Sequence, residues 1–221
     1  MSECKECGGS GLIFYYKDGY EFAKKCKCRL EREHKEMVLA SGISQLGLTF
    51  DDYKPITEQQ TKALEIAKRY TEDCENKFCV FCGQVGSGKT MLSNIIANEL
   101  LEKGYQVIYM PYQNAIIKIK QSAMDIENYN REIGKYVNAE VLVIDDLYKA
   151  MTNDTDLKYI FEIVNYRYAN NKPTIISSER SFNEMLNIDQ AIASRIYEKS
   201  KGYAIEFKGK ENNYRMYGGK K

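Results

Sequence analysis

The sequence predicts an α/β fold with a central parallel sheet and helices on both of its faces. Apolar runs typical of buried strands alternate with longer stretches whose apolar residues recur at helical spacing. In addition, a glycine-rich loop of the form GxxxxGKT, residues 83–90, joins one apolar run to one helical stretch. This alternation favours parallel strands connected by helical crossovers. The length of 221 residues allows one well-buried core and a small appendage.

The appendage is expected at the N-terminus. Residues 12–22 predict a hairpin, because Asp18-Gly19 is a favoured turn pair between two aromatic-rich runs. A charged helix is expected over residues 30–40, and the stretch after it contains two glycines and ends at Pro55, which is typical of a domain boundary. We therefore predict an N-terminal domain over residues 1–40, a linker over 41–55 and the α/β domain over 56–221.

The α/β domain is expected to begin with a helix from Thr57 to about Asp73. Thr57 is a favoured N-cap residue, with Gln60 three residues later. The segment 111–138 is too long for a single crossover helix, so we expect two helices there. The apolar runs predict five strands, at residues 78–82, 106–110, 141–145, 174–177 and 204–207.

The loop at residues 83–90 is a phosphate-binding motif. Its glycines let the backbone curl so that N–H groups face the phosphates at the positive end of a helix. Lys89 can then reach the β- and γ-phosphates, and the Thr90 hydroxyl can coordinate Mg²⁺. A plain glycine-rich turn is the alternative, which the strand before the loop and the helix after it disfavour. The residues expected to contact a nucleoside triphosphate are Gly83, Gln84, Val85, Gly86, Ser87, Gly88, Lys89, Thr90 and Met91.

A second motif, residues 141–147, consists of four apolar residues followed by Asp145, Asp146 and Leu147. Catalytic groups of open α/β sheets lie at the carboxyl ends of such buried strands. Asp145 is therefore expected to hold Mg²⁺ through water, and Asp146 to orient or deprotonate the attacking water. A strand followed by an Asp-rich turn is the alternative, but the phosphate loop about 50 residues upstream disfavours it. Together the two motifs predict an NTPase.

Overall composition adds little about partners. The chain has 32 basic and 31 acidic residues, so no global field favours a nucleic-acid partner. The excess of positive charge from Arg195 to Lys221 fits a solvated tail and a phosphate-binding patch equally well. The start of the chain lacks the apolar core of a signal peptide, and no run approaches the roughly 18 apolar residues of a membrane span. We therefore expect a cytoplasmic protein with no membrane partner.

Disulfides are rare in that compartment, so the spacing of the seven cysteines is interpreted in terms of metal binding. A CxxC pair and a CxC pair, 18 residues apart, lie at the N-terminus, and four thiolates form the standard closed zinc site. Zinc would supply the folding energy that a segment of roughly 30 residues lacks. A redox or chance grouping is the alternative, because CxC is less usual than CxxC. The expected zinc ligands are Cys4, Cys7, Cys26 and Cys28.

With these motifs, the chain resembles the DnaC/DnaI family of replicative helicase loaders, a branch of the AAA+ ATPases close to the initiator DnaA and the transposition helper IstB. The resemblance implies an AAA+ core without the C-terminal helical lid, ATP as the nucleotide, and slow, assembly-dependent hydrolysis to ADP that involves Lys89, Asp145 and Asp146. Residues 173–180 are similar to the family's sensor 1 strand. Loaders commonly have Thr-Ser-Asn where this chain has Ser177-Ser178-Glu179, so the catalytic sensor is either Ser178 or Glu179.

The stretch Ala193-Ser194-Arg195-Ile196 is similar to the family's arginine-finger box. The resemblance implies that Arg195 enters the ATP site of a neighbouring subunit and stabilises developing charge there, which ties hydrolysis to self-association. From the residues alone, Arg195 fits an amphipathic helix face better. Arg215 matches a family tail motif without an assigned role, and no sensor 2 arginine is expected.

The resemblance implies that the N-terminal zinc segment binds a hexameric DnaB-type helicase while the core binds ATP and single-stranded DNA. Two alternatives stay open. An IstB-like transposition helper acting on duplex DNA is disfavoured by the cysteine pairs, and an adaptor that uses ATP only to fix its shape is disfavoured by the intact nucleotide motifs. The candidate DNA contacts, each of which also fits a solvated helix face, are Lys118, Lys120, Arg131 and Lys135.

Overall fold

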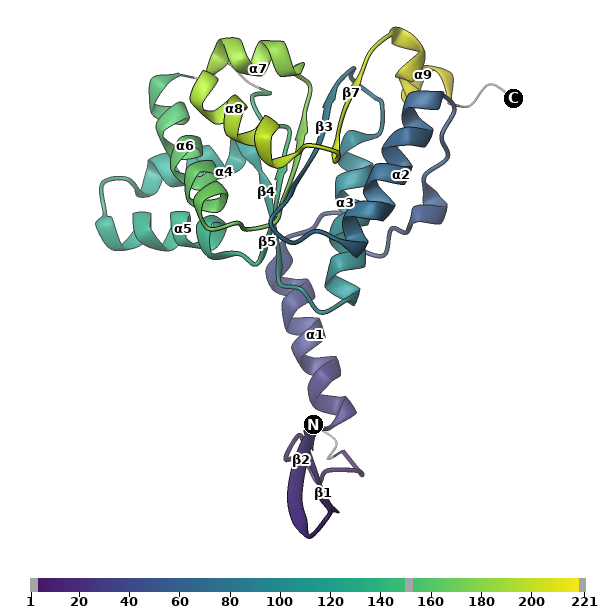
Figure 1. Ribbon diagram of the computed structural model, residues 1–221. Helices are drawn as coiled ribbons and strands as arrows, with labels where there is room; N and C mark the ends of the chain where they lie inside the picture. Colours follow the sequence, from purple (N-terminus) through teal and green to yellow (C-terminus); the bar gives the residue numbers. More distant parts are fainter. Residues whose placement is uncertain (1–3, 150–152, 219–221) are drawn as a thin grey trace. The chain divides into compact units, whose positions relative to one another are not determined.

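A computed structural model describes residues 4–149 and 153–218 of the chain. The chain divides into two compact units, Met1–Ser41 and Gly42–Lys221 (Figure 1). The first unit contains the two cysteine pairs, and the second contains both nucleotide motifs. Among the described residues, no helix is long and apolar enough to span a membrane.

The first unit is an antiparallel hairpin followed by one helix. Strands β1 (Leu12–Lys17) and β2 (Tyr20–Lys25) pair around Asp18 and Gly19, whose φ angles are 52° and 82°. Two positive φ angles at a two-residue turn match the right-handed twist of the strands, as the turn pair predicts. Helix α1 (Lys27–Ser41) begins three residues before the expected start, because the N–H groups of Arg29 and Leu30 already donate to the Cys26 carbonyl.

The second unit is built on a five-stranded parallel sheet with the order β4-β5-β6-β3-β7. The predicted α/β class is therefore confirmed. Strand β4 is shifted by one residue and extends to Pro111, which is tolerated because β4 is an edge strand. The strands are β3 (Phe78–Gly83), β4 (Val107–Pro111), β5 (Val141–Asp145), β6 (Thr174–Ser178) and β7 (Ala204–Phe207).

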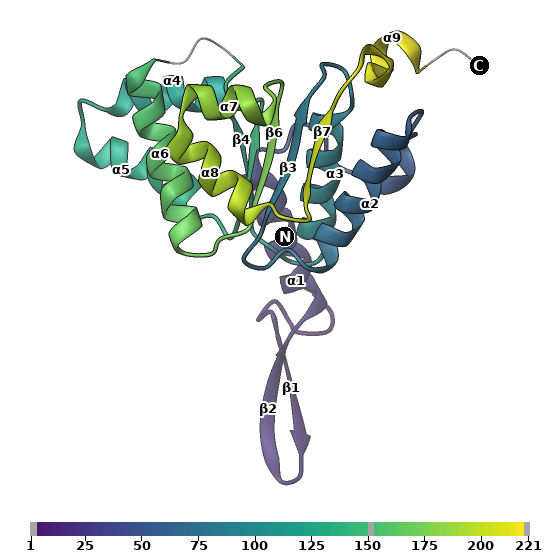
Figure 2. The same cartoon turned by 45° about the horizontal axis from the view of Figure 1, so that its top comes forward.

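Helices cover both faces of this sheet (Figures 1 and 2). One face carries α2 (Glu58–Glu72) and α3 (Lys89–Glu102), and the Thr57 side chain caps α2 by accepting the Gln60 N–H. The segment 111–138 forms two helices, as expected. The helices associated with the other face are α4 (Tyr112–Ser122), α5 (Ile126–Asn138), α6 (Asp154–Ala169), α7 (Phe182–Ile188) and α8 (Gln190–Lys199). The short elements are η1 (Phe50–Asp52), η2 (Lys210–Asn212) and α9 (Tyr214–Tyr217).

A fully buried arginine, Arg167 on α6, connects several elements of the second unit from inside. Its guanidinium donates to the carbonyls of Tyr136 and Ala139 at 3.0 and 2.8 Å, and its Nε donates to the Thr174 hydroxyl at 2.8 Å. Burial lowers the pKa of Arg167 to about 10, so the group is still charged at neutral pH. One cation therefore joins the end of α5 to the start of β6.

Candidate nucleotide and metal sites

The phosphate loop joins the end of β3 to the start of α3. Gly83, Gly86 and Gly88 have φ angles of 93°, 75° and 92°. A side chain at Gly88 would also have no space, because its Cβ would lie 2.7 Å from the ring of Tyr53. The Tyr53 hydroxyl donates to the Ser87 carbonyl at 3.2 Å. The loop therefore requires glycine for both its conformation and its close contact with Tyr53.

Lys89 lies at the centre of the loop with only 5% of its surface exposed. Its Nζ donates to the carbonyls of Gly83 and Gln84 at 3.0 and 2.7 Å. Burial lowers the pKa of Lys89, which is expected for a cation removed from water. Because its partners in the loop are neutral, the positive charge of Lys89 stays available to an anion such as phosphate.

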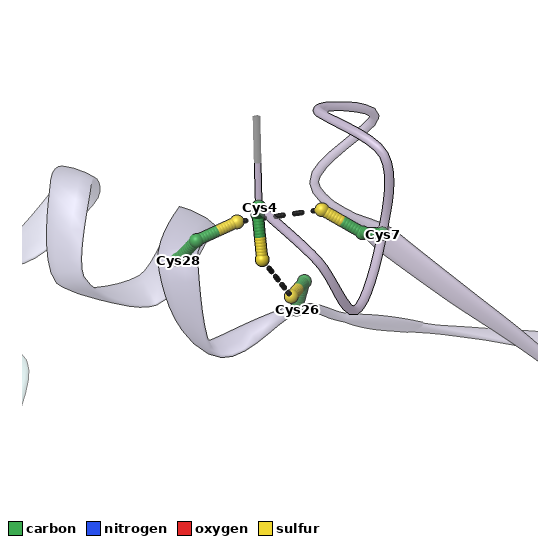
Figure 3. A group of neighbouring side chains, drawn as sticks. All are labelled: Cys4, Cys7, Cys26 and Cys28. Carbon is green, nitrogen blue, oxygen red and sulfur yellow. Dashed lines mark hydrogen bonds between the residues drawn. The ribbon is translucent and has the colours of Figure 1, made fainter. Parts of the chain in front are cut away.

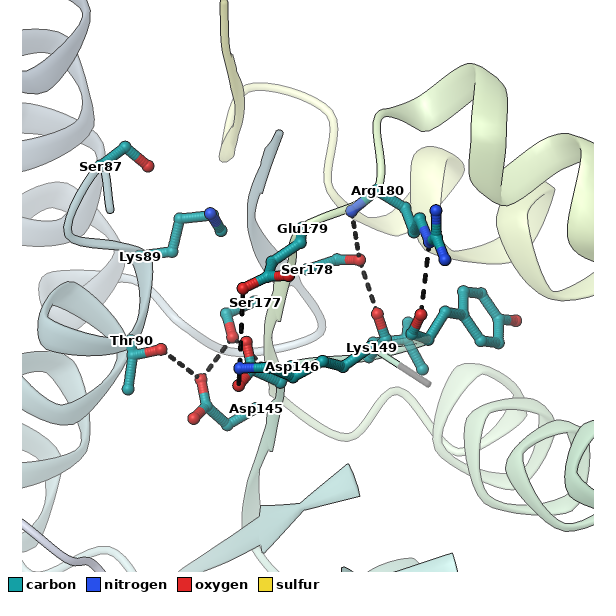
Figure 4. A network of polar contacts seen from close by, with 12 residues as sticks. Ser87, Lys89, Thr90, Asp145, Asp146, Lys149, Ser177, Ser178, Glu179 and Arg180 are labelled. Carbon is teal, nitrogen blue, oxygen red and sulfur yellow. Dashed lines mark hydrogen bonds and ion pairs between the residues drawn. The ribbon is translucent and has the colours of Figure 1, made fainter. Parts of the chain in front are cut away.

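Asp145, at the end of β5, is held by hydroxyl groups from three other elements. Thr90 on α3 donates to its Oδ1 at 3.0 Å, and Ser177 on β6 donates to the same oxygen (Figure 4). Tyr109 on β4 donates to Oδ2. Burial, followed by the hydrogen bond to Asp145, raises the pKa of Tyr109. The carboxylate is thus fixed beside the threonine that was expected to share Mg²⁺ with it, an arrangement suited to a hard divalent cation.

Asp146 lies in an ion pair at the same edge of the sheet. Its φ angle is 59°, and its Oδ2 lies 2.6 Å from Nζ of Lys149, which is also 3.6 Å from a carboxylate oxygen of Glu179 (Figure 4). The hydrogen bond to Asp146 raises the pKa of Lys149. The Asp146 N–H donates to the Ser177 hydroxyl at 2.9 Å. Ser177 therefore orients both aspartates of the motif.

A cavity of about 400 Å³ lies against the phosphate loop. Of the predicted nucleotide contacts, residues 86–91 line it, whereas residues 83–85 do not. Asp146, Lys149 and Glu179 line it from the carboxyl edge of the sheet. The remaining lining residues come from two other parts of the second unit: Gln45, Leu48, Asp52, Tyr53, Lys54, Gln60, Tyr214 and Arg215.

The two candidate sensor residues lie in different environments. The Ser178 side chain is fully buried, and its hydroxyl donates to the Leu147 carbonyl at 2.7 Å and accepts the Arg180 N–H. Glu179 lines the cavity, whereas Ser178 is not among its lining residues. Because successive side chains of a strand point to opposite sides, Ser177 reaches Asp145 and Ser178 points away from it. The geometry therefore favours Glu179 over Ser178 as a group that can respond to the nucleotide.

Arg195 does not line the cavity of its own chain. On α8, its guanidinium lies 5.3 Å from the ring centroid of Phe161 and donates to Asn165 and to the Ala191 carbonyl at 3.0 and 2.8 Å. Contact between Arg195 and a nucleotide would therefore require a second chain, and the arginine-finger role stays a prediction.

The four candidate DNA contacts lie on α4 and α5, and three of them have local partners. Lys120 forms an ion pair with Asp156, Lys135 pairs with Glu132 at 2.5 Å, and Arg131 donates to Asn128. Lys118 is exposed. The two lysines in ion pairs have part of their charge neutralised, which makes them weaker phosphate ligands.

The position of the C-terminal segment was not predicted from the sequence. The Tyr214 N–H donates to the Gly86 carbonyl at 2.8 Å, and the Arg215 side chain lines the cavity. Asn213 supports this return, since its side chain accepts the Met216 N–H and caps α9. Arg215 thus adds positive charge beside the phosphate loop, whereas its motif had carried no assigned role.

The two cysteine pairs converge at the base of the hairpin, and their four sulfur atoms lie within 4.8 Å of one another (Figure 3). Cys4 and Cys26 are 3.8 Å apart between sulfurs, and Cys7 and Cys28 are 3.5 Å apart. Tetrahedral zinc with bonds of about 2.3 Å separates its sulfur ligands by about 3.8 Å. The Gly11 N–H donates to the Cys7 sulfur and lowers the pKa of that thiol to about 6. The site therefore fits a four-thiolate zinc centre.

Comparison with known proteins gives consistent matches. Residues 48–202 match the family model described as the bacterial DnaA ATPase domain. The phage-like element PBSX protein XkdC of Bacillus subtilis (strain 168) is 32% identical over 236 residues, which cover 98% of this chain and 87% of that protein. The replicative helicase loader DnaC of Escherichia coli (strain K12) is 25% identical, covering 72% of this chain and 69% of that protein.

Among solved structures, the crystal structure of the DnaC helicase loader matches with a TM-score of 0.61 and 26% sequence identity, covering 79% of this chain and 99% of that chain. The family match spans more than half of the present chain, and the five strands of the parallel sheet and the phosphate loop lie within or directly beside it. The chain therefore belongs to the AAA+ family of the bacterial DnaA ATPase domain, as a member of its DnaC/DnaI-type helicase-loader branch.

Proposed function

We propose that this chain is an ATP-dependent loader, which binds a hexameric DnaB-type replicative helicase and assists its placement on single-stranded DNA during replication initiation. The observation that carries the proposal is the contact between Thr90 of a complete phosphate loop and Asp145, within a core of the DnaC/DnaI type. Similarity to a replicative helicase loader supports the choice of partner. Such a partner places the protein in the cytoplasm.

In the proposed mechanism, the loop N–H groups and Lys89 bind the ATP phosphates, while Thr90 and Asp145 would hold Mg²⁺, which would neutralise phosphate charge there. Asp146 orients the attacking water. Its carboxylate lies 2.6 Å from Nζ of Lys149, so it would have to leave this ion pair to orient the water. A loader in this state turns over slowly, as expected for an ATPase that times an assembly.

Assembly would bring Arg195 to the cavity of a neighbouring chain. Arg195 lies outside the cavity of its own chain, on the surface formed by α6 and α8, where ring contacts and hydrogen bonds orient its guanidinium. In a self-associated form, Arg195 of one chain would reach the phosphates bound by the next chain and stabilise the transition state. Rapid hydrolysis would then require correctly assembled chains.

The N-terminal domain, residues 1–40, is proposed to bind the helicase after zinc has ordered it. Its strands are largely exposed, and a two-stranded hairpin is marginally stable without further support. The four thiolates link the residues before β1 to those after β2, so zinc would close the hairpin at its base.

Removal of zinc is expected to unfold the first unit and leave the second unit folded. One zinc ion per chain should be found by elemental analysis, and treatment with a strong chelator should make residues 4–41 sensitive to proteolysis while ATP binding is unchanged. Cys4→Ser with Cys28→Ser should have the same effect. The matched control is Cys74→Ser, because Cys74 is buried in the second unit and lies outside the thiolate cluster. Unchanged proteolysis after complete metal removal would contradict the zinc site.

Co-purification with the replicative helicase of the host, with and without ATP, tests the proposed function. The wild-type chain is expected to retain the helicase, and Lys89→Ala is expected to lose the ATP dependence of the complex. Retention of a transposase in place of the helicase would favour the transposition helper. If Lys89→Ala supported helicase recruitment and loading like the wild type, the chain would act as an adaptor and ATP-dependent loading would be wrong.

A further inference from the structure

The hairpin of the first unit exposes an unusual number of aromatic side chains. Single exposed apolar residues are common on protein surfaces, but a contiguous group marks an interaction site. The exposed fractions are 59% for Phe14, 42% for Tyr15, 76% for Tyr16, 72% for Tyr20 and 44% for Phe22.

The register of the strands divides these residues between two faces with different chemistry. Directly opposite residues share a face, so the pairs 13 with 24, 15 with 22 and 17 with 20 lie together. We call this the aromatic-lysine face; it comprises Ile13, Tyr15, Lys17, Tyr20, Phe22 and Lys24. Within the described strands, residues 12–17 and 20–25, the one carboxylate is that of Glu21 on the opposite face. Lys25, also on that opposite face, pairs with Glu33 at 2.7 Å.

The rings of the aromatic-lysine face are already arranged as a platform. Tyr15 and Phe22 stack with an interplanar angle of 23° and centroids 5.7 Å apart, and Nζ of Lys24 lies 6.0 Å from the Tyr15 ring centroid. Tyr20 precedes Phe22 on the same face, two residues away or about 6.6 Å along the strand. Two exposed lysines, Lys17 and Lys24, flank the three rings.

We propose that this face binds single-stranded nucleic acid, with bases stacked on Tyr15, Tyr20 and Phe22 and phosphates paired with Lys17 and Lys24. Every base offers a π-face, and aromatic rings beside cations form the usual platform for single strands. The absence of carboxylates from this face suits a polyanion, and the exposure of the rings suits planar partners. The site is separate from the DNA contacts proposed for the core, and it needs no ATP.

The test is fluorescence anisotropy with a labelled thymidine oligonucleotide and the full-length, zinc-loaded protein without nucleotide. Tyr15→Ala with Phe22→Ala is expected to weaken binding about 10-fold to 100-fold, because it removes one or two stacked bases. The matched control is Phe14→Ala with Tyr16→Ala on the opposite face, which should bind like the wild type. Tyr15→Phe should also retain binding, because it keeps the ring.

The charge contribution is tested separately. Lys17→Gln with Lys24→Gln is expected to reduce the slope of log Kobs against log salt by about 1.4, because each single-strand phosphate contact contributes about 0.7. On the wild-type protein, an oligonucleotide containing 5-iododeoxyuridine should crosslink to at least one of the three rings. Zinc content and circular dichroism equal to those of the wild type show that a variant is folded.

Binding by the ring variants equal to that of the wild type, or crosslinks confined to the second unit, would overturn the site. ATP-dependent DNA binding by the core would survive that result, so the proposed loader function would stand. Loss of helicase retention with unchanged DNA binding would show that the face contacts protein, and would also overturn the proposal.

Discussion

Asp145→Asn is expected to reduce Mg²⁺-dependent ATP hydrolysis at least about 100-fold, because it removes the charge that the cation requires from a site where electrostatic stabilisation dominates. Two neighbouring serines, only one of which contacts Asp145, are expected to affect hydrolysis to different extents. Ser177→Ala should cost about 10-fold to 100-fold, as expected for a group that orients a metal ligand. Ser178→Ala is the matched control, since its hydroxyl points to the Leu147 carbonyl and the loss should be small. A larger loss for Ser178→Ala than for Ser177→Ala would contradict this arrangement.

Asp145→Asn, combined with Arg195→Ala in a second protein, tests whether the proposed site is shared between two chains. Arg195→Ala should bind ATP normally but hydrolyse it poorly, because it lacks the group that enters the neighbouring site. A mixture of Asp145→Asn and Arg195→Ala proteins should regain part of the activity, since some interfaces would combine an intact Asp145 with an intact Arg195. Steady-state ATPase assays at a fixed total concentration in the presence of the helicase measure this. Absence of recovery in a mixture shown to co-assemble would exclude Arg195 as the group supplied from the neighbouring chain.

Arg167→Met is expected to lower the free energy of unfolding by about 3–5 kcal/mol. Methionine fills most of the same volume but cannot donate, so the carbonyls of Tyr136 and Ala139 would be left buried without their partner, and each such loss costs about 1–3 kcal/mol. Urea unfolding followed by circular dichroism measures the change. Arg131→Met, at an exposed position on α5, is the control and should change the free energy of unfolding by at most about 0.5 kcal/mol. Equal unfolding midpoints for the two variants would show that the buried network contributes little.

The parts of the fold that the sequence predicted depend on short-range patterns. Strand β5 is a continuous apolar run that ends in two aspartates, and the phosphate loop has its own spacing rule, so each is visible in a few residues. The apolar runs also predicted the five strands of the parallel sheet to within one residue at each end.

The parts that were missed depend on contacts between distant residues. Ser177 and Ser178 have the same side chain, and only their places in the alternation of β6 decide which one reaches Asp145. In the sequence, Arg167 is indistinguishable from an ordinary helix residue. Its burial depends on the carbonyls of Tyr136 and Ala139 at the end of α5. Arg215 lines the cavity because its segment returns to Gly86, a pairing for which the sequence contains no local pattern.

The contact of Tyr53 with Ser87 and Gly88 has a consequence for communication within the chain. Tyr53, Gln45 and Leu48 line the cavity, and they belong to the stretch of backbone that leads from the first unit to α2. A nucleotide bound in the cavity would therefore contact the stretch of backbone that continues from the first unit. Exchange of ATP for ADP would directly alter the conformational freedom of that stretch of backbone. The effect of the nucleotide on the N-terminal domain would then be transmitted through a few consecutive residues.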